Sequence, residues 1–93
     1  MDTAEARRLL SERLAQYRPL PYSDLIVRIG RKETLEIPSQ GERPWQLEFQ
    51  FFWDSEPEGN VRVVGSIDDG GIRAFFPVTD SFIKDPGGAF IGE

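Results

Sequence analysis

The strongest pattern in this chain is the alternation of apolar and polar residues over positions 45–53. Every second residue is large and apolar, whereas three of the four residues between them are Gln or Glu. Apolar residues at period two predict a half-buried β-strand, because an amphipathic helix repeats them every three or four positions. The core-facing side of this strand would carry Trp45, Leu47, Phe49, Phe51 and Trp53.

The same alternation continues after a short polar segment. Residues 55–59 include Pro57 and end in Gly, which favours a turn, and apolar residues then recur at Val61, Val63 and Ile67. Pairing Trp53 with Val61 keeps core-facing residues opposite one another, so we predict an antiparallel hairpin here.

An earlier hairpin is predicted over residues 25–37. Residues 25, 27 and 29 alternate as a strand, and a turn over 31–33 leads to a second strand. This register places Arg28 opposite Glu36, a favourable cross-strand pair. On the core side it pairs Ile29 with Leu35 and Val27 with Ile37, with Leu25 preceding them.

A last hairpin is predicted at the sequence Asp68-Asp69-Gly70-Gly71, because Asp-Gly suits a two-residue type I′ turn. The fifth strand would then cover residues 72–76 and end at Pro77, which cannot donate to a ladder. This register sets Ile67 opposite Ile72, Gly65 opposite Ala74 and Val63 opposite Phe76.

The C-terminal segment contains one further turn signal. Asp85-Pro86-Gly87-Gly88 places Pro and Gly at the central positions of a β-turn. We therefore expect a small hairpin or flap that brings Phe82 and Ile83 near Phe90 and Ile91.

The N-terminal residues have a helical pattern instead. Asp2 suits an N-cap, and Glu5 three residues later completes a capping-box pattern. The helix is predicted over Thr3 to Tyr17, and Pro19-Leu20-Pro21 forms a stiff connector after it. One apolar stripe is made by Ala6, Leu9, Leu10, Leu14 and Tyr17.

These elements predict one α+β domain over residues 1–93, with the N-terminal helix packed on a curved antiparallel β-meander of four to five strands. One helix is about 10 Å wide, whereas five strands span about 24 Å. The rest of the apolar face would have to be covered by curvature of the sheet, by the C-terminal flap or by a second subunit.

Composition narrows the chemistry. The chain contains neither Cys nor His, which excludes thiolate catalysis, disulfides, Cys-based zinc sites and imidazole general bases. Asp54 to Asn60 has acids at the first, third and fifth positions of a calcium-loop pattern. Position twelve would be Gly65 where the pattern needs Glu, so we expect a plain acidic turn, no metal, no cofactor and no enzymatic activity.

Charge argues against nucleic acid as a partner. The net charge is −5, and residues 1–32 hold seven Lys/Arg against four Asp/Glu (7 − 4 = +3). The remaining residues hold four against twelve (4 − 12 = −8), whereas phosphate binding needs a clustered basic face. No apolar run is long enough for a membrane span and the first residues do not form a signal sequence, so we expect a cytoplasmic protein.

The solvent-facing side of the predicted sheet is not wholly polar. Phe52, Val64 and Phe75 fall on it, and the Asp69-Gly70 turn sets Val64 directly opposite Phe75, with Phe52 diagonal to Val64. Adjacent exposed apolar side chains are typical of contact surfaces. We therefore predict a patch here that binds a protein partner or forms a weak homodimer, unless the C-terminal segment covers it.

Two functions follow as hypotheses. The first is a non-catalytic protein-interaction or accessory module. The alternative is a small-ligand binder that uses the cup of the curved sheet, with Trp45, Trp53 and Tyr17 at its mouth. An enclosed cavity would favour the second hypothesis and a packed core would favour the first.

Overall fold

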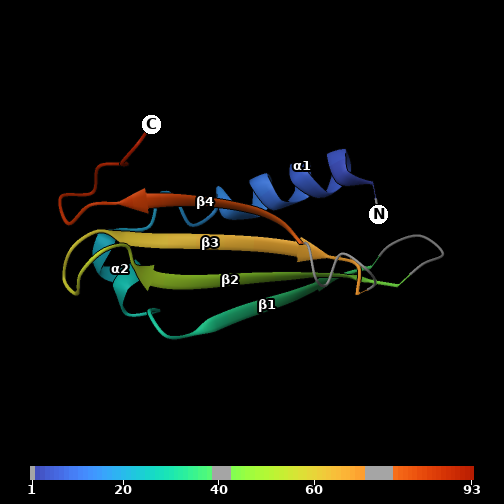
Figure 1. Ribbon diagram of the computed structural model, residues 1–93, viewed down its shortest axis with the longest axis horizontal. Coiled ribbons are helices and arrows are strands. Elements are labelled where there is room, and N and C mark those ends of the chain that lie inside the picture. The colour runs from blue at the N-terminus through green and yellow to red at the C-terminus, as the bar shows by residue number, and fades with distance from the viewer. Residues whose placement is uncertain (1, 39–42, 71–76) are drawn as a thin grey trace.

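The fold is an α+β arrangement in which an N-terminal helix lies on a four-stranded antiparallel sheet (Figure 1). The computed structural model describes residues 2–38, 43–70 and 77–93. Strand order in the sheet follows chain order, so the topology is a meander. The elements are α1 (Thr3–Leu14), α2 (Tyr22–Ile26), β1 (Lys32–Ile37), β2 (Trp45–Trp53), β3 (Val61–Asp68) and β4 (Val78–Lys84).

The central hairpin confirms the alternation in the sequence. Strand β2 pairs with β3 so that Trp53 lies opposite Val61 and Leu47 opposite Ile67. Four of the five alternating residues of β2 are buried and Trp53 is half-buried. Apolar burial is the main favourable term in folding, so this stripe is a major stabilising feature of the sheet.

Helix α1 covers the β3–β4 half of the sheet. Its buried residues Ala6, Leu10 and Leu14 recur at intervals of four, so they share the face that packs on β3 and β4. Figure 1 shows α1 running beside β4, away from β1. The core cluster is formed by Ala6, Leu10, Leu14, Leu25, Trp45, Leu47, Phe49, Phe51, Val61, Val63, Ile67, Val78 and Phe82.

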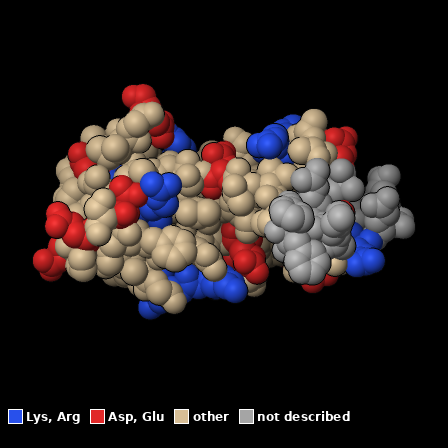
Figure 2. Space-filling view, in the orientation of Figure 1, with Lys and Arg blue, Asp and Glu red and all other residues tan. Residues whose placement is uncertain are grey.

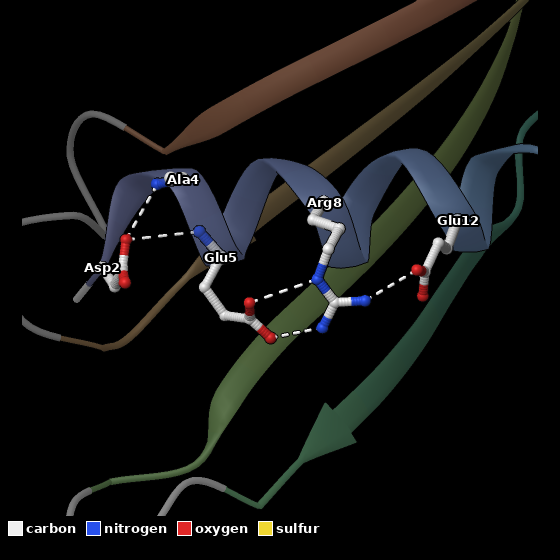
Figure 3. A network of polar contacts seen from close by, with 5 residues as sticks. All are labelled: Asp2, Ala4, Glu5, Arg8 and Glu12. Atoms are coloured by element: carbon white, nitrogen blue, oxygen red, sulfur yellow. Dashed lines mark hydrogen bonds and ion pairs between the residues drawn. The ribbon is translucent and has the colours of Figure 1, made fainter.

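The start of α1 is capped as predicted. The Asp2 carboxylate accepts hydrogen bonds from the backbone N–H groups of Ala4 (3.0 Å) and Glu5 (3.3 Å; Figure 3). The Glu5 carboxylate, in contrast, accepts from Arg8, whose Nη1 also donates to Glu12 Oε1 at 2.7 Å. This ladder of charges lowers the pKa of Glu5 through the hydrogen bond from Arg8 and lies on the exposed side of the helix.

The end of α1 comes earlier than predicted. The helix stops at Leu14, and the next turn tightens into bonds from Gln16 N–H to the Arg13 carbonyl and from Tyr17 N–H to the Leu14 carbonyl. Such three-residue spacing is common where a helix terminates. Tyr17 therefore leaves the helix just before the Pro19-Leu20-Pro21 connector.

The predicted strand at Leu25–Ile29 is wrong. Residues 22–26 form α2, Leu25 is fully buried and Val27 is 63% exposed, so the residues do not alternate across one face. The segment also fits helical spacing, because the core-packed residues Tyr22, Leu25, Ile26 and Ile29 are separated by three, one and three positions. Over so few residues the two periods overlap, and packing against β2 and β3 selects the helix.

The pairings predicted for that strand are wrong as well. Strand β1 pairs with β2, which places Leu35 opposite Leu47, Glu36 opposite Gln46 and Ile37 opposite Trp45. The Arg28–Glu36 pair therefore does not form.

The register predicted for a fifth strand at 72–76 is also wrong. Those residues lie outside the described part of the chain. The edge of β3 to which the prediction assigned them is paired with β4. Val78 lies opposite Ile67, Asp80 opposite Gly65 and Phe82 opposite Val63. The Asp-Gly signal is local and does not determine which later segment reaches the edge of β3.

The C-terminal turn agrees with the prediction. Asp85 N–H donates to the Ala89 carbonyl at 2.8 Å, and the Ile91 N–H donates to the Ile83 carbonyl at 2.9 Å. The Phe82 and Phe90 rings meet edge to face with centroids 5.8 Å apart. This segment therefore folds back along β4.

Gly65 gives the first testable prediction, because the α1–sheet contact leaves no room for a side chain there. A Cβ atom at this position would lie 2.9 Å from Leu10 Cδ1 and 2.9 Å from Phe49 Cε1. We expect Gly65→Ala to destabilise the fold by about 1–3 kcal/mol, as overpacking of a core does. Urea unfolding followed by Trp fluorescence would measure the change.

The matched control is Gly87→Ala, where the nearest atom to an added Cβ is Asp85 Oδ1 at 3.4 Å. That variant should unfold at nearly the same urea concentration as the original chain. Equal stability of the Gly65 variant and the original chain would contradict tight packing of α1 on β3.

Candidate interaction surfaces

The outer face of the sheet carries part of the predicted patch. Phe52 is 46% exposed and lies opposite Arg62, while Val64 lies opposite Gln50, so Phe52 and Val64 are diagonal neighbours as expected. Val64 faces Ser81 on its other side, so the predicted Val64–Phe75 pair is wrong, and Phe75 itself lies outside the described residues.

The register adds one apolar residue that the sequence analysis missed. Ile83, on β4, lies opposite Arg62 of β3, and Arg62 in turn lies opposite Phe52 of β2. The alternation of β4 could have revealed it, because Ile83 is one residue away from the core residue Phe82. Phe52, Val64 and Ile83 are thus the described apolar residues of this patch.

A second open surface lies at β1. Register places Glu33, Leu35 and Ile37 on the core side of the sheet, opposite Phe49, Leu47 and Trp45. Yet Leu35 is 38% exposed, because α1 packs on β3 and β4 and α2 packs on β2 and β3. Neither helix reaches far enough to cover β1.

A shallow cleft of about 240 Å³ separates β1 from the end of α1. Its lining residues are Arg13, Gln16, Tyr17, Glu33, Thr34, Leu35 and Phe49. The Tyr17 ring packs on Phe49 and Phe51, with centroids 4.9 Å and 5.6 Å apart, and so closes the cleft toward the core.

Polar contacts fix the floor of this cleft. The Tyr17 hydroxyl donates a 2.6 Å hydrogen bond to Glu33 Oε1, and Glu33 Oε2 lies 3.7 Å from Arg28 Nε. Burial, followed by the bond to Glu33, raises the pKa of Tyr17 to about 12. Among the described residues, two guanidinium nitrogens of Arg28, Nε and Nη1, are buried with no hydrogen-bond partner. Through Glu33, these contacts join β1 to Tyr17 in the segment after α1 and to Arg28 in the segment after α2.

The cup hypothesis needs Trp45, Trp53 and Tyr17 to share one opening. The two Trp residues lie at opposite ends of β2, eight residues and therefore about 27 Å apart. Trp45 is buried in the core, which is filled by apolar side chains. The structure therefore does not bring these three side chains to one site.

Lys84 is the buried charged residue of the described core. It is 5% exposed, and its Nζ donates to the carbonyls of Arg18 and of Leu20, the latter at 2.8 Å. Burial lowers its pKa. Lys84 therefore ties the connector after α1 to β4.

The acidic turn after β2 is organised by an ion pair. Asp54 Oδ1 accepts hydrogen bonds from Arg62 Nε (2.9 Å) and Nη2 (2.7 Å), so the first oxygen of the calcium-loop pattern is already occupied. In the part of the chain that the structure describes, no three His, Cys, Asp or Glu side chains are grouped to hold a metal.

Basic and acidic side chains are interspersed across the face shown in Figure 2. The described residues contain no helix long and apolar enough to cross a membrane.

Comparison with known proteins gives no assignment: no family model, no curated protein and no solved structure matches the chain.

The Tyr17–Glu33 contact gives a second prediction. In a Tyr22→Phe background Tyr17 is the only tyrosine, and its ultraviolet titration should give a pKa of about 12. Glu33→Gln should lower this pKa, but it should stay above the ordinary value of 10 because burial is the larger cause.

The raised pKa of Tyr17 also predicts how the free energy of unfolding changes with pH. The folded state holds the phenolic proton more tightly than the unfolded state, so the contribution is complete below about pH 10 and is lost as pH rises toward about 12. Urea unfolding at several alkaline pH values would test it, with Tyr17→Phe as the matched control that lacks this component. A Tyr17 pKa near 10 would contradict the contact.

Proposed function

We propose that this chain is a non-catalytic protein-interaction module that binds an extended segment of a protein partner along β1. One observation carries the proposal: among the described residues, none pairs with the second edge of β1, while the core-side residue Leu35 is left 38% exposed. An unpaired edge beside an uncovered apolar side chain is a surface that a further strand can complete.

Strand addition uses both features. The backbone N–H and C=O groups on the free edge of β1 supply hydrogen bonds to an extended partner. Every second side chain of that partner would lie on the core side, beside Leu35 and in reach of the cleft at Tyr17. Burial of Leu35 would add apolar stabilisation that the isolated chain lacks.

The other edge of the sheet is less suited to this role. The C-terminal segment folds back on β4, with a bridge between Lys84 and Phe90 and the hydrogen bond from Ile91 N–H to the Ile83 carbonyl. That segment occupies hydrogen-bonding positions at the C-terminal end of β4, beside Ile83 and Lys84, where an added strand would otherwise pair.

The titratable groups near the cleft support a binding role over a catalytic one. Tyr17 has a raised pKa and stays protonated at neutral pH, which makes it a poor base. Glu33, the carboxylate beside it, already contacts both Tyr17 and Arg28. A small-ligand role is less well supported, because the cleft of about 240 Å³ is below the size of most ligand pockets.

Photo-cross-linking tests the proposed surface. A photoreactive benzoylphenylalanine at position 35 of the tagged chain, irradiated in its native cells, should give a discrete protein adduct. The same group at Ser55, an exposed turn residue, should give none. Mass spectrometry of the adduct should locate the cross-link in an extended segment of the partner.

A cross-linker at position 52 separates this proposal from the outer patch. Adducts at position 52 alone would assign the interaction to the surface of Phe52, Val64 and Ile83. The absence of a protein adduct at both position 35 and position 52 would contradict an interaction module of this kind.

A further inference from the structure

We propose that the partner at β1 is a second copy of this chain. Two β1 strands would pair antiparallel about a two-fold axis at Thr34 and join two four-stranded sheets into one of eight strands. The inference rests on the proposed function and names its partner. What carries it is the self-complementary charge of the exposed face of β1.

The outer face of β1 carries Lys32, Thr34 and Glu36, all of them exposed. In an antiparallel pair centred on Thr34, Lys32 of each copy lies opposite Glu36 of the other, and the two Thr34 residues face each other. Opposite charges and Thr–Thr pairs are both favourable in cross-strand positions. The two-fold axis repeats the Lys–Glu pair, so both charges of each copy are matched.

Neighbouring registers lose this match. A pair centred on Leu35 sets Lys32 opposite Pro38 and Thr34 opposite Glu36, whereas one centred on Glu33 sets the two Glu33 residues against each other. Registers that pair odd with even positions would place core-side residues opposite solvent-side residues. Within β1, the register centred on Thr34 is therefore the one that matches both charges.

The charges of β1 are available for such a contact. The Glu36 side chain forms no hydrogen bond or ion pair with the residues that the structure describes, and the contact between Lys32 Nζ and Glu48 Oε1 is 4.0 Å long. Charged residues on an edge strand ordinarily discourage pairing. Here they alternate so that two copies in antiparallel orientation attract.

The core side of β1 fits the same register. The Leu35 residues of the two copies become diagonal neighbours, about 7–8 Å apart, within reach of one another's side chains. Glu33 lies opposite Leu35 of the second copy, but its carboxylate is already held by Tyr17 and Arg28. Pairing therefore covers the exposed Leu35 without leaving a carboxylate unpartnered.

The first measurement is the mass in solution. Five residue pairs form a small contact, so we expect a weak dimer whose fraction rises with concentration up to about 1 mM in sedimentation equilibrium. Raising the salt concentration should weaken it, because the matched charges are exposed. A chain that remains monomeric to about 1 mM at low salt overturns the inference.

Charge variants identify the register. Lys32→Glu sets two acidic side chains opposite each other and Glu36→Lys sets two basic ones, so each variant alone should dimerise at least about tenfold more weakly. In a mixture of the two variants, the introduced acid of one chain lies opposite the introduced base of the other. The native Glu36 of the first chain then lies opposite the native Lys32 of the second. Two variants that are monomeric alone should therefore form a mixed dimer, detected by energy transfer between differently labelled chains.

Matched controls make the same charge changes elsewhere. Arg7→Glu on α1 and Glu56→Lys in the turn after β2 alter exposed residues, and both should dimerise like the original chain. Urea unfolding of every variant would confirm that the fold is retained. A dimer that survives both β1 variants, or one lost only in Phe52→Ser, overturns the inference.

The outcomes also separate the two proposals. A monomeric chain whose position-35 cross-linker captures a different protein contradicts the second copy and leaves the interaction module intact. A monomeric chain with no adduct at position 35 or position 52 contradicts both.

Discussion

The packing of one short helix against half of a sheet determines the rest of this structure. Ala6, Leu10 and Leu14 lie on β3 and β4, and Gly65 lets Leu10 and Phe49 approach the backbone of β3 closely. Because a helix is about 10 Å wide, α1 cannot also cover β1. The same contact that builds the core therefore leaves one edge of the sheet open.

The remaining contacts reinforce this asymmetry. Lys84 holds the connector after α1 against β4, and the C-terminal segment folds back on the same strand, so several interactions cover the C-terminal end of β4. At β1, by contrast, Tyr17 and Glu33 line a cleft beside the exposed Leu35, and Arg28 forms an ion pair with Glu33. The covered strand β4 and the uncovered strand β1 thus lie at opposite edges of the sheet, which is why the proposed interactions lie at β1.

Prediction from sequence succeeded where one period dominated over many residues. The alternation of β2 spans nine residues and admits no helical interpretation, and Asp2 capped the first helix as expected. It failed over residues 25–29, where alternating and helical spacing overlap. It also failed in the pairing of β3. The Asp-Gly turn signal is local and does not show that Val78–Lys84 is the segment that pairs with β3. For the outer patch it correctly placed Phe52 diagonal to Val64 but missed Ile83.

The sequence by itself determined the class of fold, the strong central hairpin, and a chemistry without thiol or imidazole groups. These follow from side-chain pattern and composition, which act locally. Only the tertiary structure decided which strand stays uncovered and which residues meet across the sheet. The first outcome depends on which strands α1 packs against, because the helix is narrower than the sheet. The second depends on which later segment pairs with the free edge of β3, because that edge accepts one partner strand.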